Sequence, residues 1–327
     1  MLDRLREPWT DRRAGLLLGA LACFVLLVIV FIIVFMALRA WPSFAHNGLS
    51  WFSAKGNVDQ QLDKMVNSGA NPGSADYELG AWPLIYATLL TTGLAAFVGL
   101  FFSLFSAIFI VEFAPNGVRR VIVPIVRLLA AIPSVIYGLI GILVLAPFVG
   151  NSLVSQERKG SVQYVIPLSG TGLMVAVAVL TVMITPIMIA ITVDGLYSIP
   201  KPWKEGALAL GVNRWRAMWT VTVRAARPAI IAGAVLATAR ALGEAIMISM
   251  VAGSKGFSPN PLDGLTFLFE PLRTLAATVV EDSESINAPA MQASLYAMAL
   301  VLLAGAFFLS LGSWFAKQPL KKYGTRS

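Results

Sequence analysis

Two ionisable residues of opposite charge, Arg240 and Glu244, lie four positions apart in an otherwise apolar run. A charge inside a membrane costs at least about 2.5–3.5 kcal/mol, so such residues usually face protein or a water-filled path. Four positions along a helix place both on one face. In one interpretation they neutralise each other as an internal ion pair. In the other, which we favour, Arg240 offers a planar fork of donors to an oxyanion, and Glu244 holds it when no anion is bound.

The composition indicates a chain that buries its outer surface in lipid. Of its 327 residues, 57% are hydrophobic and only 13% are charged, whereas soluble proteins carry about 25% charged residues. The mean hydropathy is +0.76. The net charge of +8 would suggest nucleic acid as a partner of a soluble protein. Here Lys and Arg lie between apolar runs, so we read them as orienting the chain in a membrane and expect no nucleic-acid partner.

Several chemistries are poorly supported by the residue inventory. Cys23 is the only cysteine and His46 the only histidine, which argues against a disulfide, a histidine metal cluster or a Ser-His-Asp triad. The sequence has no GxxxxGK[ST] loop to hold ATP phosphates. We therefore expect no cofactor, no metal and no catalytic site, and any ATP hydrolysis must come from a partner.

Six apolar runs predict an all-α integral membrane protein with six transmembrane helices. The first run has 25 residues without a charge, which at about 1.5 Å per residue crosses a bilayer and exceeds a signal-peptide core. The runs are 14–38, the stretch between Glu78 and Glu112, 121–149, the stretch between Lys159 and Asp194, 229–253, and 289–316.

Positive charge predicts the orientation of these spans. The two termini and the loops 112–120 and 194–228 hold sixteen of the 25 Lys and Arg residues, and the opposite loops hold seven. By the positive-inside rule, both termini and the 194–228 loop face the cytoplasm. The external segments 39–80 and 254–288 are long enough to form short interfacial helices or a cap, or to be ordinary connecting loops.

The third apolar run, 121–149, contains a proline and an arginine that are unusual within a transmembrane helix. Pro133, followed by Ser134, predicts a kink, because proline removes a backbone hydrogen bond and clashes with the preceding turn. Such a kink can line a path or simply accompany helix packing around small residues. Arg127 lies near the cytoplasmic end, so we expect its long side chain to snorkel to the lipid headgroups.

The 194–228 loop predicts a compact pair of short helices. A first helix can begin near Trp203 and end at Gly211, where glycine suits a left-handed cap. A second can begin at Asn213, a good N-cap residue. Physical chemistry alone leaves two roles open, because an exposed basic knob can dock a partner or lie on anionic lipid.

The motif in this loop resembles a known family. Glu205, Gly206, Ala207 and Gly211 are similar to the EAA loop of ABC-importer permeases, Glu-Ala-Ala-x-x-x-Gly. In that family the loop is the coupling helix, which docks into a groove of the ATPase subunit, and the resemblance implies this role here. Gly206 replaces the first alanine of the pattern, and Arg224 stands where the pattern ends in Leu-Pro.

Two further segments, 129–139 and 239–245, resemble phosphate-importer permeases. The long N-terminal span and external loop are more similar to the C-type subunit than to its A-type partner. The resemblance implies a membrane-spanning subunit that moves inorganic phosphate into the cytoplasm by alternating access, coupled to an ATPase through the 203–219 loop. It also associates Arg240 and Glu244 with the transport path.

The same resemblance implies partners and a location. The partners are a homologous A-type permease subunit, two ATPase subunits, an external phosphate-binding protein, phosphate and membrane lipid, and the location is the plasma membrane of a prokaryote. We divide the chain into 1–82 (N-terminal tail, first span and external loop), 83–316 (permease core) and 317–327 (cytoplasmic tail).

Other functions are weaker alternatives. A permease for sulfate or molybdate is the nearest, since arginine suits those anions too. An ion-coupled secondary transporter would need membrane carboxylates, and only Glu244 is available. A membrane anchor for a signalling complex would not require Arg240 and Glu244 inside a span.

Overall fold

The structure is a computed structural model that describes residues 9–154, 159 and 168–318, and within these ranges its regular structure is helical apart from one isolated bridge between Gly253 and Leu272. Six helical stretches in this part of the chain are long and apolar enough to cross a membrane, which confirms the predicted fold class. They are Arg13–Phe52, Ser74–Phe113, Ser134–Leu153, Leu173–Tyr197, Arg214–Leu242 and Pro289–Ala316.

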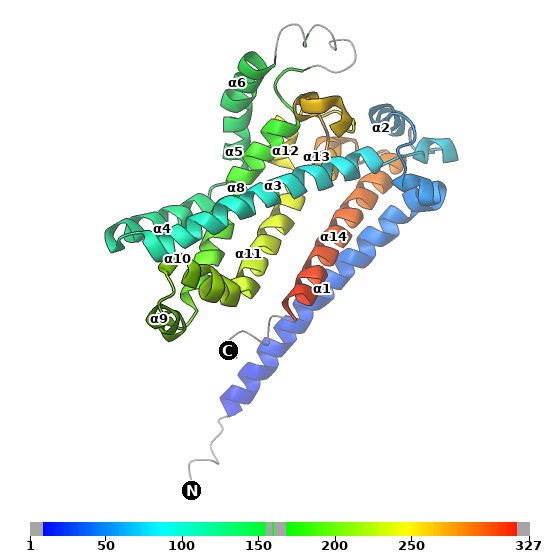
Figure 1. Ribbon diagram of the computed structural model, residues 1–327. Helices are drawn as coiled ribbons and strands as arrows, with labels where there is room; N and C mark the ends of the chain where they lie inside the picture. The colour runs from blue at the N-terminus through cyan, green and yellow to red at the C-terminus, as the bar shows by residue number, and fades with distance from the viewer. Residues whose placement is uncertain (1–8, 155–158, 160–167, 319–327) are drawn as a thin grey trace.

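Five long helices form the framework (Figure 1). They are α1 (Trp9–Asn47), α3 (Trp82–Ile108), α8 (Leu173–Tyr197), α11 (Arg224–Leu242) and α14 (Pro289–Lys317). Shorter helices are α4 (Asn116–Ala130), α5 (Ser134–Ile140), α6 (Ala146–Phe148), α9 (Lys201–Ala209), α10 (Arg214–Ala217) and α12 (Ile246–Val251). The segments 39–80 and 254–288, which the sequence predicts to be external, hold α2 (Val58–Val66) and α13 (Leu275–Glu281), with the 3-10 turns η2 (Gly48–Phe52), η3 (Ser74–Tyr77), η8 (Pro261–Phe269) and η9 (Ser283–Ser285).

Four π-helical segments extend or join these helices. They are η4 (Phe109–Phe113), η5 (Gly141–Leu145), η6 (Val149–Leu153) and η7 (Met218–Val223). One π-turn inserts an extra residue into a helix and changes the direction of the side chains that follow, so such turns often mark functional regions. Here η4 extends α3, and η7 joins α10 to α11.

The core lies where α3, α8 and α11 pack together. Its centre is built from residues of α8 such as Leu180, Met183 and Ile184, all at most 1% exposed. Close approach of α8 and α11 requires a small residue, since a Cβ on Gly195 would lie 2.4 Å from the Cβ of Ala229. The α1 helix packs beside α14 at the edge of this core (Figure 1).

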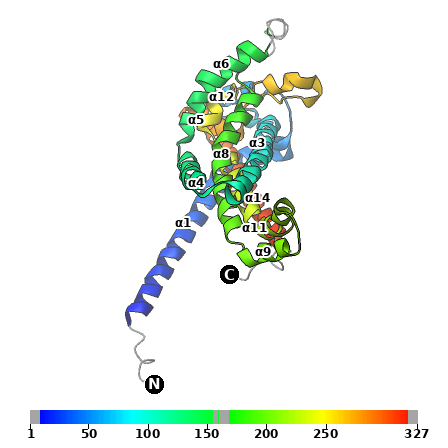
Figure 2. The same ribbon diagram turned by 60° about the vertical axis from the view of Figure 1, so that its left-hand side comes forward.

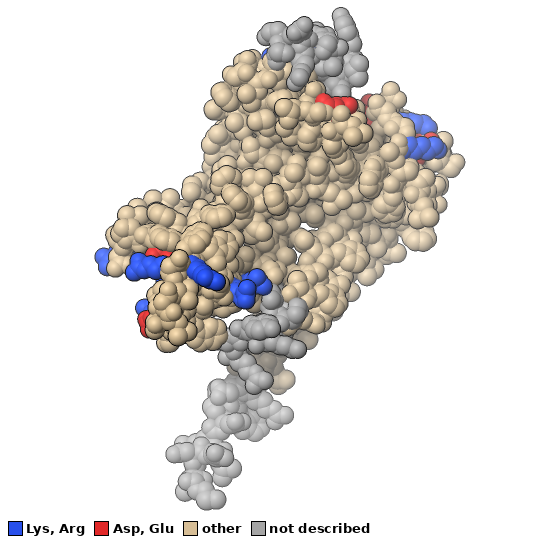
Figure 3. All heavy atoms as spheres, in the orientation of Figure 1, with Lys and Arg blue, Asp and Glu red and all other residues tan. Residues whose placement is uncertain are grey.

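Charged side chains gather at two ends of the molecule on the face shown in Figure 3. Blue and red atoms cluster around α9 and α4 at one end and around α2 at the other, with an uncharged surface between them. Large apolar side chains such as Phe24, Phe97 and Leu143 are more than 60% exposed. This distribution fits a protein whose middle is surrounded by lipid.

The third span differs from its prediction. Instead of one kinked helix over 121–149, α4 ends at Ala130 and α5 begins at Ser134, so the span is Ser134–Leu153. Pro133 precedes the first residue of α5, and its ring disfavours a helical conformation at the residue before it. The predicted kink is therefore a complete break. The amphipathic α4 is a separate helix with no buried residue.

The fifth span also ends earlier than predicted. Instead of one helix over 229–253, α11 stops at Leu242 and α12 starts at Ile246. The side chain of Glu244 accepts a hydrogen bond from the backbone N–H of Met247 (3.1 Å), which provides a partner for the start of α12. The prediction failed because it treated Glu244 as a residue within a helix, whereas it lies in the break.

The external segments form a packed cap, which decides between the two alternatives that the sequence left open. Trp51, Leu62 and Met65 are at most 2% exposed and belong to one apolar cluster with Leu275 and Met291. Since these residues come from both external segments and from the start of α14, the cap joins distant parts of the chain. Its short helices lie over the end of the helical framework (Figure 1).

A buried arginine ties the two external segments together by charge. Arg273 is 9% exposed and lies 2.7 Å from Glu281, 2.9 Å from Asp282 and 3.9 Å from Asp59 of α2. Burial raises the pKa of the Asp282 carboxyl, and the positive charge of Arg273 opposes that rise. Burial also raises the pKa of the Glu270 carboxyl, and a hydrogen bond from the backbone N–H of Asn260 opposes that rise. Arg273 therefore holds three carboxylates in the cap, those of Asp59, Glu281 and Asp282.

We predict that Arg273→Met destabilises the cap by about 3–5 kcal/mol, because it leaves partly buried carboxylates without their counter-charge. Purified protein should show a lower melting temperature and faster proteolysis of the external segments. Lys55→Met is the matched control, since the Lys55–Glu78 pair is exposed and contributes about 0–1 kcal/mol. Equal stability of the two variants would contradict this role of Arg273.

Candidate substrate path and coupling surface

Arg240 lies in the last turn of α11 and reaches the end of another helix. Its Nη1 donates to the carbonyl oxygen of Ala130, the last residue of α4, at 3.4 Å. Beside it, the hydroxyl of Tyr137 donates to the carbonyl oxygen of Leu129 at 2.9 Å. The last carbonyls of a helix lack partners within the helix and carry partial negative charge. Arg240 and Tyr137 together supply donors to the end of α4.

Arg240 and Glu244 do not share a helix face, contrary to the sequence prediction, because α11 ends between them. Among the described residues no ion pair joins them: the arginine donates to Ala130, and the carboxylate accepts from Met247. Neither mutual neutralisation nor the holding of Arg240 by Glu244 is therefore seen. Their assignment to a transport path stays a prediction.

The two helix breaks lie next to each other because α5 and α12 pack closely. A Cβ added to Gly138 of α5 would lie 2.8 Å from the Sδ of Met250 and 3.2 Å from the Cα of Met247. Any larger residue there would require the Met250 side chain to move and α12 to shift slightly. The segment that follows Pro133 and the segment that follows Glu244 thus form one packed unit beside Arg240.

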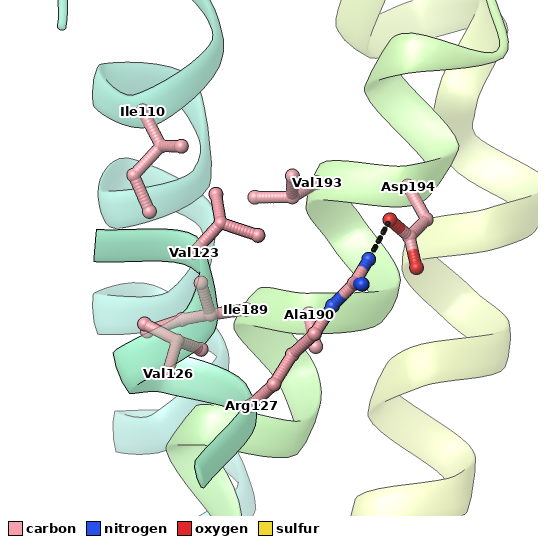
Figure 4. Close-up of a pocket in the computed structure, with 8 residues that line it drawn as sticks. All are labelled: Ile110, Val123, Val126, Arg127, Ile189, Ala190, Val193 and Asp194. Atoms are coloured by element: carbon pink, nitrogen blue, oxygen red, sulfur yellow. Dashed lines mark hydrogen bonds and ion pairs between the residues drawn. The ribbon is translucent and has the colours of Figure 1, made fainter. Parts of the chain in front are cut away.

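Arg127 is not directed only to lipid headgroups. Its Nη2 lies 3.1 Å from Oδ1 of Asp194 on α8, and both side chains are about 60% exposed (Figure 4). The apolar residues around this pair leave a pocket of only about 10 Å³. That space suits no more than about one water molecule, so this is a contact between α4 and α8 and not a substrate site.

The first predicted short helix of the 194–228 loop is confirmed as α9, whereas the predicted second helix is wrong as a separate element, because α10 continues through η7 into α11 as the single stretch Arg214–Leu242. Gly211 follows α9 with φ +79, and two hydrogen bonds close the turn, from Gly211 N to Leu208 O (3.0 Å) and from Val212 N to Ala207 O (3.2 Å). This pattern is a Schellman motif. Asn213 then caps α10 by accepting from Arg216 N at 2.7 Å. Local sequence alone therefore specifies this turn.

The surface of α9 is available to a partner in the isolated chain. Glu205, Gly206 and Gly211 are exposed, Ala207 is half-buried, and no residue of α9 is buried. Large apolar side chains accompany the motif, with Trp203 43% exposed and Leu210 86% exposed. The helix projects from one end of the molecule in both ribbon views (Figures 1 and 2).

Sequence reasoning missed the residues that support α9 from behind. Glu112, read only as the boundary of the second span, forms an ion pair with Lys204, and its side chain is 4% exposed. Arg119 closes the end of η4 by donating to the carbonyls of Ile110 (3.0 Å) and Val111 (2.7 Å). The only feature of the sequence that could have indicated this support is the carboxylate of Glu112 at the end of the second apolar run.

A family model described as "Binding-protein-dependent transport system inner membrane component" matches residues 99–316, which include α9, Arg240 and both helix breaks. The chain therefore belongs to this family, and it is a multi-pass inner-membrane permease component of an ABC importer. Importers of this class work with ATPase and substrate-binding partners.

Three relatives of this chain, each 31–32% identical to it, are permease proteins of ABC or phosphate transport systems. The "Probable ABC transporter permease protein YqgH" of Bacillus subtilis is 31% identical and covers 94% of this chain and 91% of its own length. The "Phosphate transport system permease protein PstC" of Mesorhizobium japonicum is 32% identical and covers 71% of each chain. "PstC 1" of Mycobacterium tuberculosis is 31% identical over 87% of this chain and 86% of its own.

Two solved structures share the fold at low sequence identity. One is an inward-facing MetNI methionine ABC transporter, with a TM-score of 0.52, 17% identity, and coverage of 74% of this chain and 94% of that one. The other is a bacterial ABC transporter for alginate import, with a TM-score of 0.51, 15% identity, and coverage of 93% and 97%. These likenesses support the permease architecture alone.

We predict that Gly211→Val strains the turn after α9, because a β-branched residue at positive φ costs about 1–2 kcal/mol or more. The variant should insert in the membrane but co-purify with less ATPase than the wild type. Gly117→Val is the matched control, since a Cβ there meets nothing within 4 Å and the glycine has no positive φ. Normal ATPase capture by Gly211→Val would show that the turn is unimportant for docking.

Proposed function

We propose that this chain is the C-type permease subunit of a phosphate importer and that Arg240 is a ligand of the transported anion. The observation that carries the proposal is the state of Arg240. Its side chain is exposed, and its one hydrogen bond among the described residues is the 3.4 Å contact with Ala130 O. A guanidinium has five N–H donors in a planar fork, so most remain available for a tetrahedral oxyanion. The names of the PstC relatives favour phosphate over sulfate or molybdate.

In this proposal the anion replaces the carbonyl of Ala130 on Arg240. The carbonyl carries only a partial negative charge, whereas phosphate offers full charge and bidentate geometry. Glu244 contributes indirectly to the path: by capping α12, it holds the packed α5–α12 unit beside Arg240. Arg240 therefore has two states in this proposal: it donates to Ala130 O when no anion is bound, and it donates to phosphate when the anion is bound.

The proposed complex contains a homologous A-type permease subunit, two ATPase subunits and an external phosphate-binding protein. Glu205, Gly206, Ala207 and Gly211 form the surface that docks on the ATPase. This chain acts as a non-catalytic subunit. The described ends of α1 and α14 lie on the same side as α9 in Figure 1, opposite the cap, which supports a topology with both termini in the cytoplasm. We retain the division into 1–82, 83–316 and 317–327.

The proposal predicts that vesicles containing the full complex take up radiolabelled phosphate when ATP and the binding protein are supplied. Excess unlabelled phosphate should compete, and sulfate or molybdate should not. Vesicles with this chain alone should take up no phosphate, with or without ATP. Selective uptake of sulfate by the full complex would contradict the proposed substrate, and gradient-driven uptake by the single chain would contradict the class of transporter.

The proposal also predicts that Arg240→Lys lowers phosphate uptake by about tenfold or more, because lysine keeps the charge but loses the planar fork. Uptake should be normalised to the assembled complex. Arg227→Lys is the matched control, since Arg227 is an exposed arginine on the same helix. If Arg240→Lys transports as well as Arg227→Lys, Arg240 does not bind the anion through its fork.

A further inference from the structure

Glu112 is a nearly buried carboxylate that the anion path does not use. Its side chain is 4% exposed and pairs with Lys204 of α9, which is 28% exposed. A buried carboxylate costs several kcal/mol unless a counter-charge and hydrogen bonds compensate. The two residues are 92 positions apart in the sequence. Their pairing therefore fastens the docking helix to the end of the second span.

Glu112 stands on a firmly held helix end. It belongs to η4, whose carbonyls at Ile110 and Val111 accept hydrogen bonds from the guanidinium of Arg119. The central carbon of the same guanidinium lies 5.6 Å from the ring centroid of Tyr197, the last residue of α8. One arginine thus connects the end of α3 to the end of α8, and Glu112 has little freedom to follow α9 independently of both.

The α9 helix, in contrast, has little apolar support on this side. None of its residues is buried, and a pocket of about 320 Å³ lies between it and the ends of α3 and α8. Tyr197, Leu208 and Thr222 are among the residues that line this pocket. Of the ion pairs between described residues, only that of Lys204 with Glu112 joins α9 to α3. A charged link rather than a packed core therefore sets the position of α9 on α3.

The α3 helix extends from this link to the external cap (Figure 1). Near its other end, Thr88 Oγ1 accepts a hydrogen bond from the backbone N–H of Leu275, in the cap, at 3.0 Å. Along its length α3 packs on α8 and α11. A displacement of the Glu112 end can thus reach both the core helices and the cap through one continuous element.

We propose that the Glu112–Lys204 pair transmits displacement of α9 to α3 and so couples ATP hydrolysis to rearrangement of the spans. The inference rests on the proposed function in one respect, that α9 docks on the ATPase. Both residues are positioning residues, because neither contacts the anion.

The test measures phosphate transported per ATP hydrolysed by the reconstituted full complex. Glu112→Gln keeps the shape of the side chain and removes its charge, and we expect this ratio to fall about tenfold, within the range typical of coupling between sites. Assembly with the ATPase should stay normal. Exchanging the charges, with Glu112→Lys and Lys204→Glu in one chain, should recover most of the ratio. Glu78→Gln, which makes the same change in the exposed Lys55–Glu78 pair, should have no effect.

Three outcomes would overturn the inference: an unchanged ratio in Glu112→Gln, a loss of transport fully explained by lost assembly, or no recovery on charge exchange. The wild-type complex separates this test from that of the proposed function. If wild type takes up no phosphate, the proposed substrate fails. If wild type transports and Glu112→Gln couples equally well, only the role of the pair fails.

Discussion

The carbonyl groups at the end of a helix need hydrogen-bond donors wherever water is excluded. In this protein the last carbonyls of α4 accept hydrogen bonds from the hydroxyl of Tyr137 and the guanidinium of Arg240. These donors come from α5 and α11, so closing one helix end brings three elements together. The arginine donates to a neutral acceptor at 3.4 Å, and in the proposed function an anion replaces that acceptor.

At the second helix break, between α11 and α12, a backbone group at a helix end again finds a side-chain partner. Glu244 follows the end of α11 and accepts a hydrogen bond from the backbone N–H of Met247 at the start of α12, and the glycine at 138 lets α5 approach α12 closely. Broken helices inside a membrane protein are tolerated where protein or a water-filled path surrounds them. Both breaks lie beside Arg240, so the proposed transport path has irregular backbone at the residue that we propose as the anion ligand.

Features set by local sequence were predictable, and features set by packing were not. The six spans follow from runs of apolar residues, and the turn after α9 follows from Gly211 and Asn213, whose conformations depend on immediate neighbours. The partner of Arg240 is a backbone carbonyl 110 positions away, which no residue type in the sequence reveals. A spacing of four between Arg240 and Glu244 suggested pairing only as long as the helix was assumed continuous. The burial of Glu112 likewise depends on where α9 folds back.

The central claim is that the anion takes the place of Ala130 O on Arg240. A structure of the full complex, determined by cryo-electron microscopy with phosphate bound, tests it most directly. The account predicts density for phosphate within hydrogen-bond distance of the Arg240 guanidinium, with the carbonyl of Ala130 displaced from it. Phosphate bound elsewhere in the permease, with Arg240 still donating to Ala130, would contradict the account.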